Sequence, residues 1–203
     1  FTLNKETTGG YIHSWNVSPT FFPENMQAPS IRIKYLMDNA KKVGLDDLAM
    51  PDQKTNDRLI EECHEITYED FKEYYASDIA KEQGTLWNVD KFYNALFMRK
   101  ETHDRVKSEI GRSVSLVYPA ADCAVIRFYN PKLGIIGLTH SDAVQTTRGI
   151  IGKSVDYMVE HFGSNKDDIE VYVGAFAKEG WEYDKLPDFA KEGDGISPVW
   201  KDY

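Results

Sequence analysis

The fold of this 203-residue chain is decided by the stretch ADCAVIRFYNPKLGIIGLTH, which spans residues 121–140. It holds one β-rich run at 123–129, a turn-forming segment at 130–134 and a second β-rich run at 135–140. Two such runs joined by a short turn predict a β-hairpin, which returns the chain to the end where it started. We therefore expect Cys123 and His140 to lie close together, although 17 positions separate them in the sequence.

A thiol next to an imidazole has two chemical uses. The imidazole can accept the thiol proton and leave a thiolate nucleophile. Alternatively, the sulfur and a ring nitrogen can both bind a metal ion. A free cysteine is also a common small core residue, so the spacing alone leaves a purely structural interpretation open.

The residues on both sides of the hairpin alternate between strand and helix patterns. Further strands are predicted at 113–118 and 168–173, a loop at 45–55 and a polar segment at 101–112. Helices are predicted at four places: after Pro29 as far as Gly44, from a Thr67 cap to Gly84, after an Asn88 cap, and from Ile150 to about Gly163. This order predicts one α/β domain over residues 1–203, with a mixed β-sheet and flanking helices.

The charge and residue composition exclude some classes of binding partner. The net charge of −9 argues against nucleic acid and anionic membranes, because both require basic surface. No run approaches the roughly 20 apolar residues of a membrane span, and residues 1–10 lack the pattern of a signal peptide. The two cysteines, Cys63 and Cys123, are expected to be reduced, which favours a cytoplasmic location. The oligomeric state is left open.

Several motifs resemble those of the laccase-domain (YfiH-like) family. Ala121-Asp122-Cys123 followed by His140 is similar to the family's signature, and Phe162-Gly163-Ser164-Asn165 and Gly174 are similar to later elements. The likeness is close from residue 114 to 174, and the family pattern continues further, so we expect its C-terminal part to be absent or altered here. The resemblance implies a YfiH-like α/β fold, related in outline to cysteine deamidases.

The resemblance also implies an activity and a cofactor. Its family site holds zinc or copper on one cysteine and two histidines, and members act on purine nucleosides, by phosphorolysis or deamination, or on phenolic substrates. Cys123 and His140 would be metal ligands here, while the first family histidine falls on Thr55. The family's tryptophan and arginine after the last histidine are replaced by Ser141-Asp142-Ala143-Val144-Gln145. Arg148 and Asp122 are therefore the candidate substrate-binding residues.

Three hypotheses remain open. The first is a metal-dependent enzyme acting on a purine nucleoside with phosphate or a similar small molecule, through Cys123 and His140. The second is a metal-free hydrolase or deamidase in which Cys123 attacks, His140 is the base and Thr55 orients the imidazole; it predicts a low thiol pKa. The third is a degenerate, non-catalytic binding protein of the same fold. His64 could supply a missing ligand, but Cys63 and His64, being adjacent on a strand, should point to opposite faces.

Overall fold

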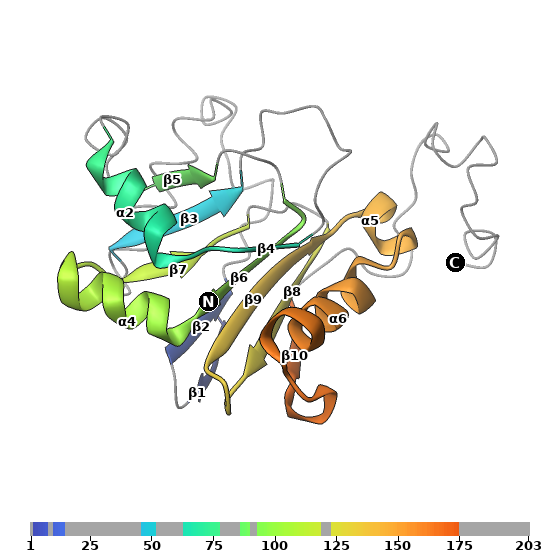
Figure 1. Cartoon of the computed structure of the whole chain (residues 1–203). Coiled ribbons are helices and arrows are strands. Elements are labelled where there is room, and N and C mark those ends of the chain that lie inside the picture. The colour runs from blue at the N-terminus through green and yellow to red at the C-terminus, as the bar shows by residue number, and fades with distance from the viewer. Residues whose placement is uncertain are drawn as a thin grey trace.

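The computed structural model describes residues 2–7, 10–14, 46–51, 63–77, 86–89, 93–118 and 123–174. These segments form three β-sheets with helices packed on them (Figure 1). The largest sheet has five strands in the order β10-β8-β9-β6-β4, and a three-stranded sheet has the order β5-β3-β7. The N-terminal strands β1 (Thr2–Thr7) and β2 (Gly10–Ser14) pair as an antiparallel hairpin.

The five-stranded sheet contains both parallel and antiparallel pairs. Strand β4 (Cys63–Glu65) runs parallel to β6 (Ala95–Arg99), whereas β9 (Ile135–Ser141) is antiparallel to β6 and to β8 (Ala124–Asn130). The edge strand β10 (Glu170–Val173) is antiparallel to β8. The predicted α/β class with a mixed sheet is thus confirmed.

The predicted hairpin at 121–140 is also confirmed. Seven ladder pairs join β8 to β9, from Ala124 with Ser141 to Asn130 with Ile135. The Asn130 side chain closes the turn by accepting hydrogen bonds from the backbone of Lys132 and Leu133. Gly137 lies at the centre of β9, where an added Cβ would come within 2.4 Å of the Phe97 ring. The sheet therefore requires glycine at this position for Phe97 to pack across it.

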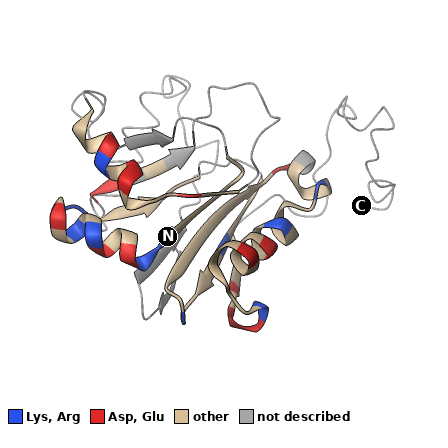
Figure 2. Ribbon diagram, viewed as in Figure 1, with Lys and Arg blue, Asp and Glu red and all other residues tan. Residues whose placement is uncertain are grey.

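Helices cover both faces of this sheet, as Figure 1 shows. Helix α6 (Ile150–Phe162) packs on one face, and its C-terminus is closed by Gly163 in the left-handed conformation at φ 71°. Helices α2 (Tyr68–Ala76) and α4 (Lys100–Glu109) lie on the other side, together with the three-stranded sheet. Charged side chains concentrate along α2, α4 and α6, whereas β6, β8 and β9 carry few (Figure 2).

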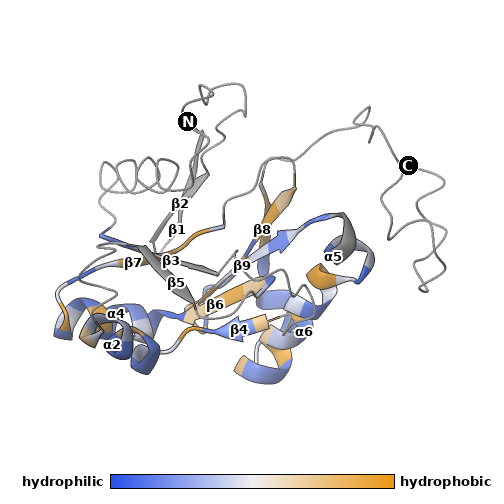
Figure 3. Cartoon of the chain, turned by 90° about the horizontal axis from the view of Figure 1, so that it is seen from above, coloured by the Kyte–Doolittle hydropathy of each residue, from blue (hydrophilic) through white to orange (hydrophobic). Residues whose placement is uncertain are grey.

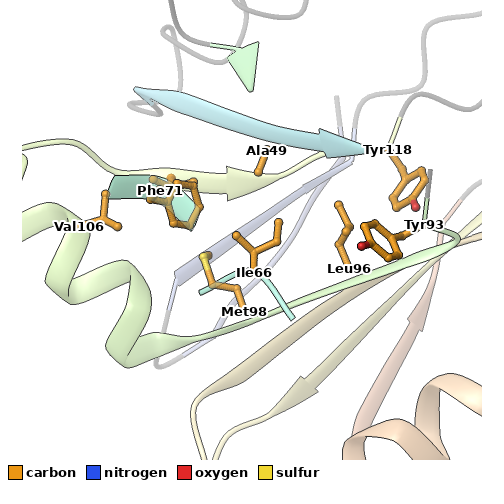
Figure 4. Packing of buried hydrophobic residues seen from close by; sticks show 9 residues of the cluster. Ala49, Ile66, Phe71, Tyr93, Leu96, Met98, Val106 and Tyr118 are labelled. Atoms are coloured by element: carbon orange, nitrogen blue, oxygen red, sulfur yellow. The ribbon is translucent and has the colours of Figure 1, made fainter. Parts of the chain in front are cut away.

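Strand alternation sends side chains into two separate cores. The first core lies on the α2 and α4 side and includes Leu96 and Met98 from β6, with Tyr93 and Tyr118 at one end (Figure 4). The second core lies under α6 and includes Ala95 and Phe97 from the same strand. Strand β6 is therefore apolar on both faces, as its hydropathy in Figure 3 also shows.

The remaining strands form the smaller sheet. Strand β3 (Asp47–Pro51) is parallel to β5 (Leu86–Val89) and to β7 (Val114–Leu116). The carboxylate of Asp47, 2% exposed, accepts hydrogen bonds from the Tyr75 hydroxyl and from the Arg112 guanidinium. This buried ion pair holds α2, β3 and the segment after α4 together.

Three predictions of local structure were wrong, and the polar segment at 101–112, for which no element was predicted, contains most of α4, which buries only Thr102 and Val106. The helix after Asn88 is instead β5 and β6, because Ala95 to Met98 are buried on both faces and such a run carries no period. The loop at 45–55 contains β3, and α2 ends at Ala76 rather than at Gly84. The helix predicted after Pro29 lies outside the described residues.

Candidate functional site

The strand register determines where Cys123 and His140 lie. His140 of β9 is the ladder partner of Val125 in β8, and Cys123 comes two positions before Val125. Cys123 lies in a bend immediately before β8, so its backbone is diagonally opposite that of His140 across the two strands. Diagonal neighbours have Cα atoms about 7–8 Å apart, a separation that two side chains can bridge. Both residues are partly buried.

Neighbouring strands fix the backbone and the ring of His140. Its backbone N–H donates to the carbonyl of Asn94, just before β6, at 2.8 Å. Its ring stacks on that of Tyr118, with 5.8 Å between centroids and 16° between planes. Tyr118 is buried and belongs to the first core, close to Tyr93 (Figure 4). The buried ring of Tyr118 therefore packs against one face of the imidazole.

Burial keeps the Tyr118 hydroxyl protonated. Desolvation raises its pKa well above the usual value, and the nearby Cys63 thiol adds a smaller contribution in the same direction. This hydroxyl has no hydrogen-bond partner, nor has the side-chain oxygen of the buried Asn94, as far as the described part of the chain extends. The site thus contains a neutral phenol and an amide oxygen that the protein leaves unsatisfied.

The other histidine near this edge belongs to a separate contact. His64 of β4 stacks on Tyr93 with 4.3 Å between ring centroids, on the face of the first core. Cys63 packs against the second core, on the opposite face. The prediction that Cys63 and His64 point to opposite faces is confirmed.

The other predicted site residues do not gather around His140 in the described structure. Thr55 and Asp122 lie outside the described residues, so their predicted roles stay predictions. Arg148 is exposed in the turn after α5 (Ala143–Thr147). Asp142, which follows β9, accepts a hydrogen bond from the backbone of Gln145 at 2.7 Å, so it caps α5.

The residues present do not fit a three-ligand metal centre. Within the described ranges, no group of three or more His, Cys, Asp or Glu side chains could hold a metal ion. A catalytic zinc site ordinarily uses three protein ligands, and at Thr55 the resemblance places a hydroxyl where the family has an imidazole. In the described ranges, Cys123 and His140 therefore have no third side chain that would complete such a site.

Sequence reasoning missed Tyr118 and Asn94. Each contacts His140 from a different part of the chain. Tyr118 lies in the segment after β7, and Asn94 lies just before β6. The available signal was the position of each residue: Tyr118 ends the predicted strand 113–118, and Asn94 begins a buried apolar run. Polar groups at strand ends commonly form sites in α/β sheets.

Comparison with known proteins agrees with the motifs. Residues 84–183 match the family model described as multi-copper polyphenol oxidoreductase laccase. This match confirms, over residues 84–183, the resemblance to the laccase-domain family seen in the sequence. Among curated proteins no match is found.

Three solved structures are similar in outline. The Bacillus licheniformis hypothetical protein YfiH is 22% identical with a TM-score of 0.47, over 71% of this chain and 46% of that one. YlmD from Geobacillus stearothermophilus is 19% identical with a TM-score of 0.48, over 72% and 47%. Neisseria meningitidis protein NMB0706 is 14% identical with a TM-score of 0.42, over 72% and 45%. The chain thus spans less than half the length of each of these three structures.

The described helices bear on one further prediction. None of them has the length and apolar character that a membrane-crossing helix requires.

Proposed function

We propose that this chain hydrolyses the carbon–nitrogen bond of a small polar amide through a thiol–imidazole pair, with Cys123 as nucleophile and His140 as base. The observation that supports it is the β8–β9 register, in which His140 pairs with Val125, two positions from Cys123. A nucleophile and its base must lie within hydrogen-bond reach, and residues at diagonal positions on neighbouring strands have backbones close enough for their side chains to meet.

The chemistry needs no further reactant than water. His140 takes the thiol proton, and the thiolate of Cys123 attacks the amide carbon. The carbon–nitrogen bond breaks as the imidazolium returns the proton to the leaving nitrogen, which departs as ammonia or an amine. Water, activated by the same imidazole, then hydrolyses the thioester to a carboxylic acid and restores the thiol.

The surroundings of His140 suit this role. The Asn94 carbonyl holds the backbone of His140, and the Tyr118 ring packs against its imidazole. A fixed ring loses little entropy on reaching the reactive geometry. Because Tyr118 remains a neutral phenol, it adds no charge that would repel a thiolate.

A panel of small amides tests the proposal, with released ammonia or amine as the readout. We expect Cys123→Ser and His140→Gln each to lower kcat/KM for a hydrolysed amide by at least about 100-fold. Cys63→Ser is the matched control, because its thiol lies on the opposite face, in the second core. Equal rates in wild type and Cys123→Ser would contradict the proposal.

The family match favours a second candidate, a metal-dependent enzyme acting on purine nucleosides or phenolic compounds with zinc or copper. That reading needs a third ligand beyond Cys123 and His140. Metal analysis of the purified protein separates the two candidates. About one zinc or copper per chain, lost in His140→Gln, would favour the second. A protein with neither metal bound nor amide hydrolysed would be a non-catalytic relative.

A further inference from the structure

Arg127 is a buried cation near the candidate site. It lies in the middle of β8, where its ladder partners are Leu138 of β9 and Tyr172 of β10. It comes two positions after Val125, the partner of His140, whereas Cys123 comes two positions before. Arg127 is therefore a diagonal neighbour of His140 on the same sheet face, on the side away from Cys123 along the chain. Only 9% of Arg127 is exposed.

The structure gives Arg127 no countercharge. Its Nη1 atom is buried without a hydrogen-bond partner, and no carboxylate pairs with the guanidinium among the residues described. Burial lowers its pKa, with only a small opposing effect of Tyr172. Burying an unpaired guanidinium is costly, and in native proteins such groups are nearly always paired. A charged group retained in a strand at this cost indicates a ligand that pairs with it.

Two further unsatisfied atoms belong to residues that contact the same histidine. The Oδ1 atom of Asn94 and the hydroxyl of Tyr118 are buried without hydrogen-bond partners in the described structure. Asn94 pairs with His140 through the backbone, and Tyr118 stacks on its ring. Together with Arg127, they offer a cation, an amide oxygen and a phenol around one imidazole. These groups complement a molecule that carries an anionic group and a polar nitrogen.

We infer that Arg127 binds the anionic group of a small ligand at this site, while Asn94 and Tyr118 hydrogen-bond its polar part. A guanidinium suits a carboxylate or a phosphate, since it can donate two parallel hydrogen bonds to either. That this ligand is the substrate of Cys123 rests on the function proposed above, which would make the substrate an anionic amide. Anion binding itself does not depend on that function.

Arg127 is a better candidate for this role than the arginine predicted from the sequence. Arg148 is exposed in the turn after α5, where water solvates it. The sequence did carry a signal for Arg127, a lone charge within the apolar strand Ala124–Asn130. A charge in such a position rarely serves packing alone.

Thermal unfolding with added anions tests the inference. The probes are inorganic phosphate and succinamate, which carries a carboxylate and a primary amide, each compared with chloride at equal ionic strength. We expect at least one probe to raise Tm by about 5 °C at saturation. Arg127→Met should abolish this rise and Arg127→Lys should keep part of it, because lysine retains the cation. Arg148→Met is the control and should keep the full rise.

A second readout separates ligand binding from a structural role. Without anion, Arg127→Met should have a Tm equal to or above that of wild type, because it removes a buried unpaired charge. A lower Tm with an unchanged anion response would mean that Arg127 only supports the fold, and would overturn the inference. So would a wild type that responds to neither probe.

The response of Cys123→Ser distinguishes this inference from the proposed function. Anion binding retained in that variant, alongside a wild type that hydrolyses no amide, would leave the inference standing while the hydrolase proposal failed. A rise with succinamate alone identifies a carboxylate ligand, and a rise with phosphate alone identifies a phosphate ligand.

Discussion

The ring of His140 stacks on the ring of Tyr118 at 5.8 Å between centroids, and the hydroxyl of that tyrosine is buried without a partner in the described structure. The ring and the hydroxyl therefore have separate consequences. The ring fills the end of the first core and supports the imidazole. The hydroxyl makes no hydrogen bond in the described structure that would offset the free-energy cost of burying it.

Tyr118→Phe keeps the ring and removes the hydroxyl. We expect the free energy of unfolding to be unchanged or higher by up to about 1 kcal/mol, because a buried hydroxyl without a partner carries a desolvation cost. Tyr118→Ala should lose about 3–5 kcal/mol through the lost packing. Denaturant unfolding measures both, and a loss above about 1 kcal/mol in Tyr118→Phe would mean that the hydroxyl has a partner.

Gly137 and Gly152 form a matched pair for testing the packing of β9 against β6. An added Cβ at Gly137 would clash with the Phe97 ring, whereas one at Gly152 in α6 meets nothing within 4 Å. Gly137→Ala should therefore destabilise the protein by about 1–3 kcal/mol. Gly152→Ala should stabilise it by about 0.5–1 kcal/mol, since alanine favours a helix. Equal effects in denaturant unfolding would refute this packing of the hairpin.

Asp47 should matter far more to stability than a surface carboxylate. Asp47→Asn removes the charge of a buried carboxylate that accepts hydrogen bonds from Arg112 and the Tyr75 hydroxyl, so we expect a loss of about 1.5–3 kcal/mol. Asp104→Asn is the control, because its pair with Lys100 is half exposed and such pairs contribute about 0.5 kcal/mol or less. Similar losses in the two variants would show that Asp47 is not buried in an ion pair.

The raised pKa of Tyr157 predicts that the protein loses stability at alkaline pH. Burial raises the pKa of Tyr157 to about 12, with smaller contributions from Glu65 and Cys63. A raised pKa means that the stability is complete below the unfolded value of 10.0 and is lost as pH rises through about 12. Tyr157→Phe removes this titration, so its unfolding midpoint should fall less steeply than that of wild type over that range. Parallel curves for the two proteins would contradict the assignment.

The hairpin and α6 could be predicted because their signals are local. The turn chemistry at 130–134 and the left-handed Gly163 act within a few residues, and so does the capping box of Thr67 and Asp70 in α2. Strand β6 could not be predicted, because Leu96 and Phe97 are buried in different cores and a run apolar on both faces also fits a helix.

The candidate site was predictable only in part. Cys123 and His140 belong to one hairpin, so turn length alone relates them. Arg127 belongs to the same hairpin, whereas Tyr118 and Asn94 reach His140 from the segment after β7 and from the start of β6, which no local pattern relates to it. The anion-binding residue expected from sequence, Arg148, was therefore chosen by proximity in the chain rather than by position on the sheet.

The central claim is that His140 activates the thiol of Cys123, and the pH dependence of iodoacetamide alkylation tests it most directly. The measurement uses a Cys63→Ser background, so that only Cys123 reacts. We expect the rate to rise with an inflection below about pH 7.5, and His140→Gln to move the inflection back toward the ordinary thiol value of about 8.5. An inflection near 8.5 both with and without His140 would contradict the claim.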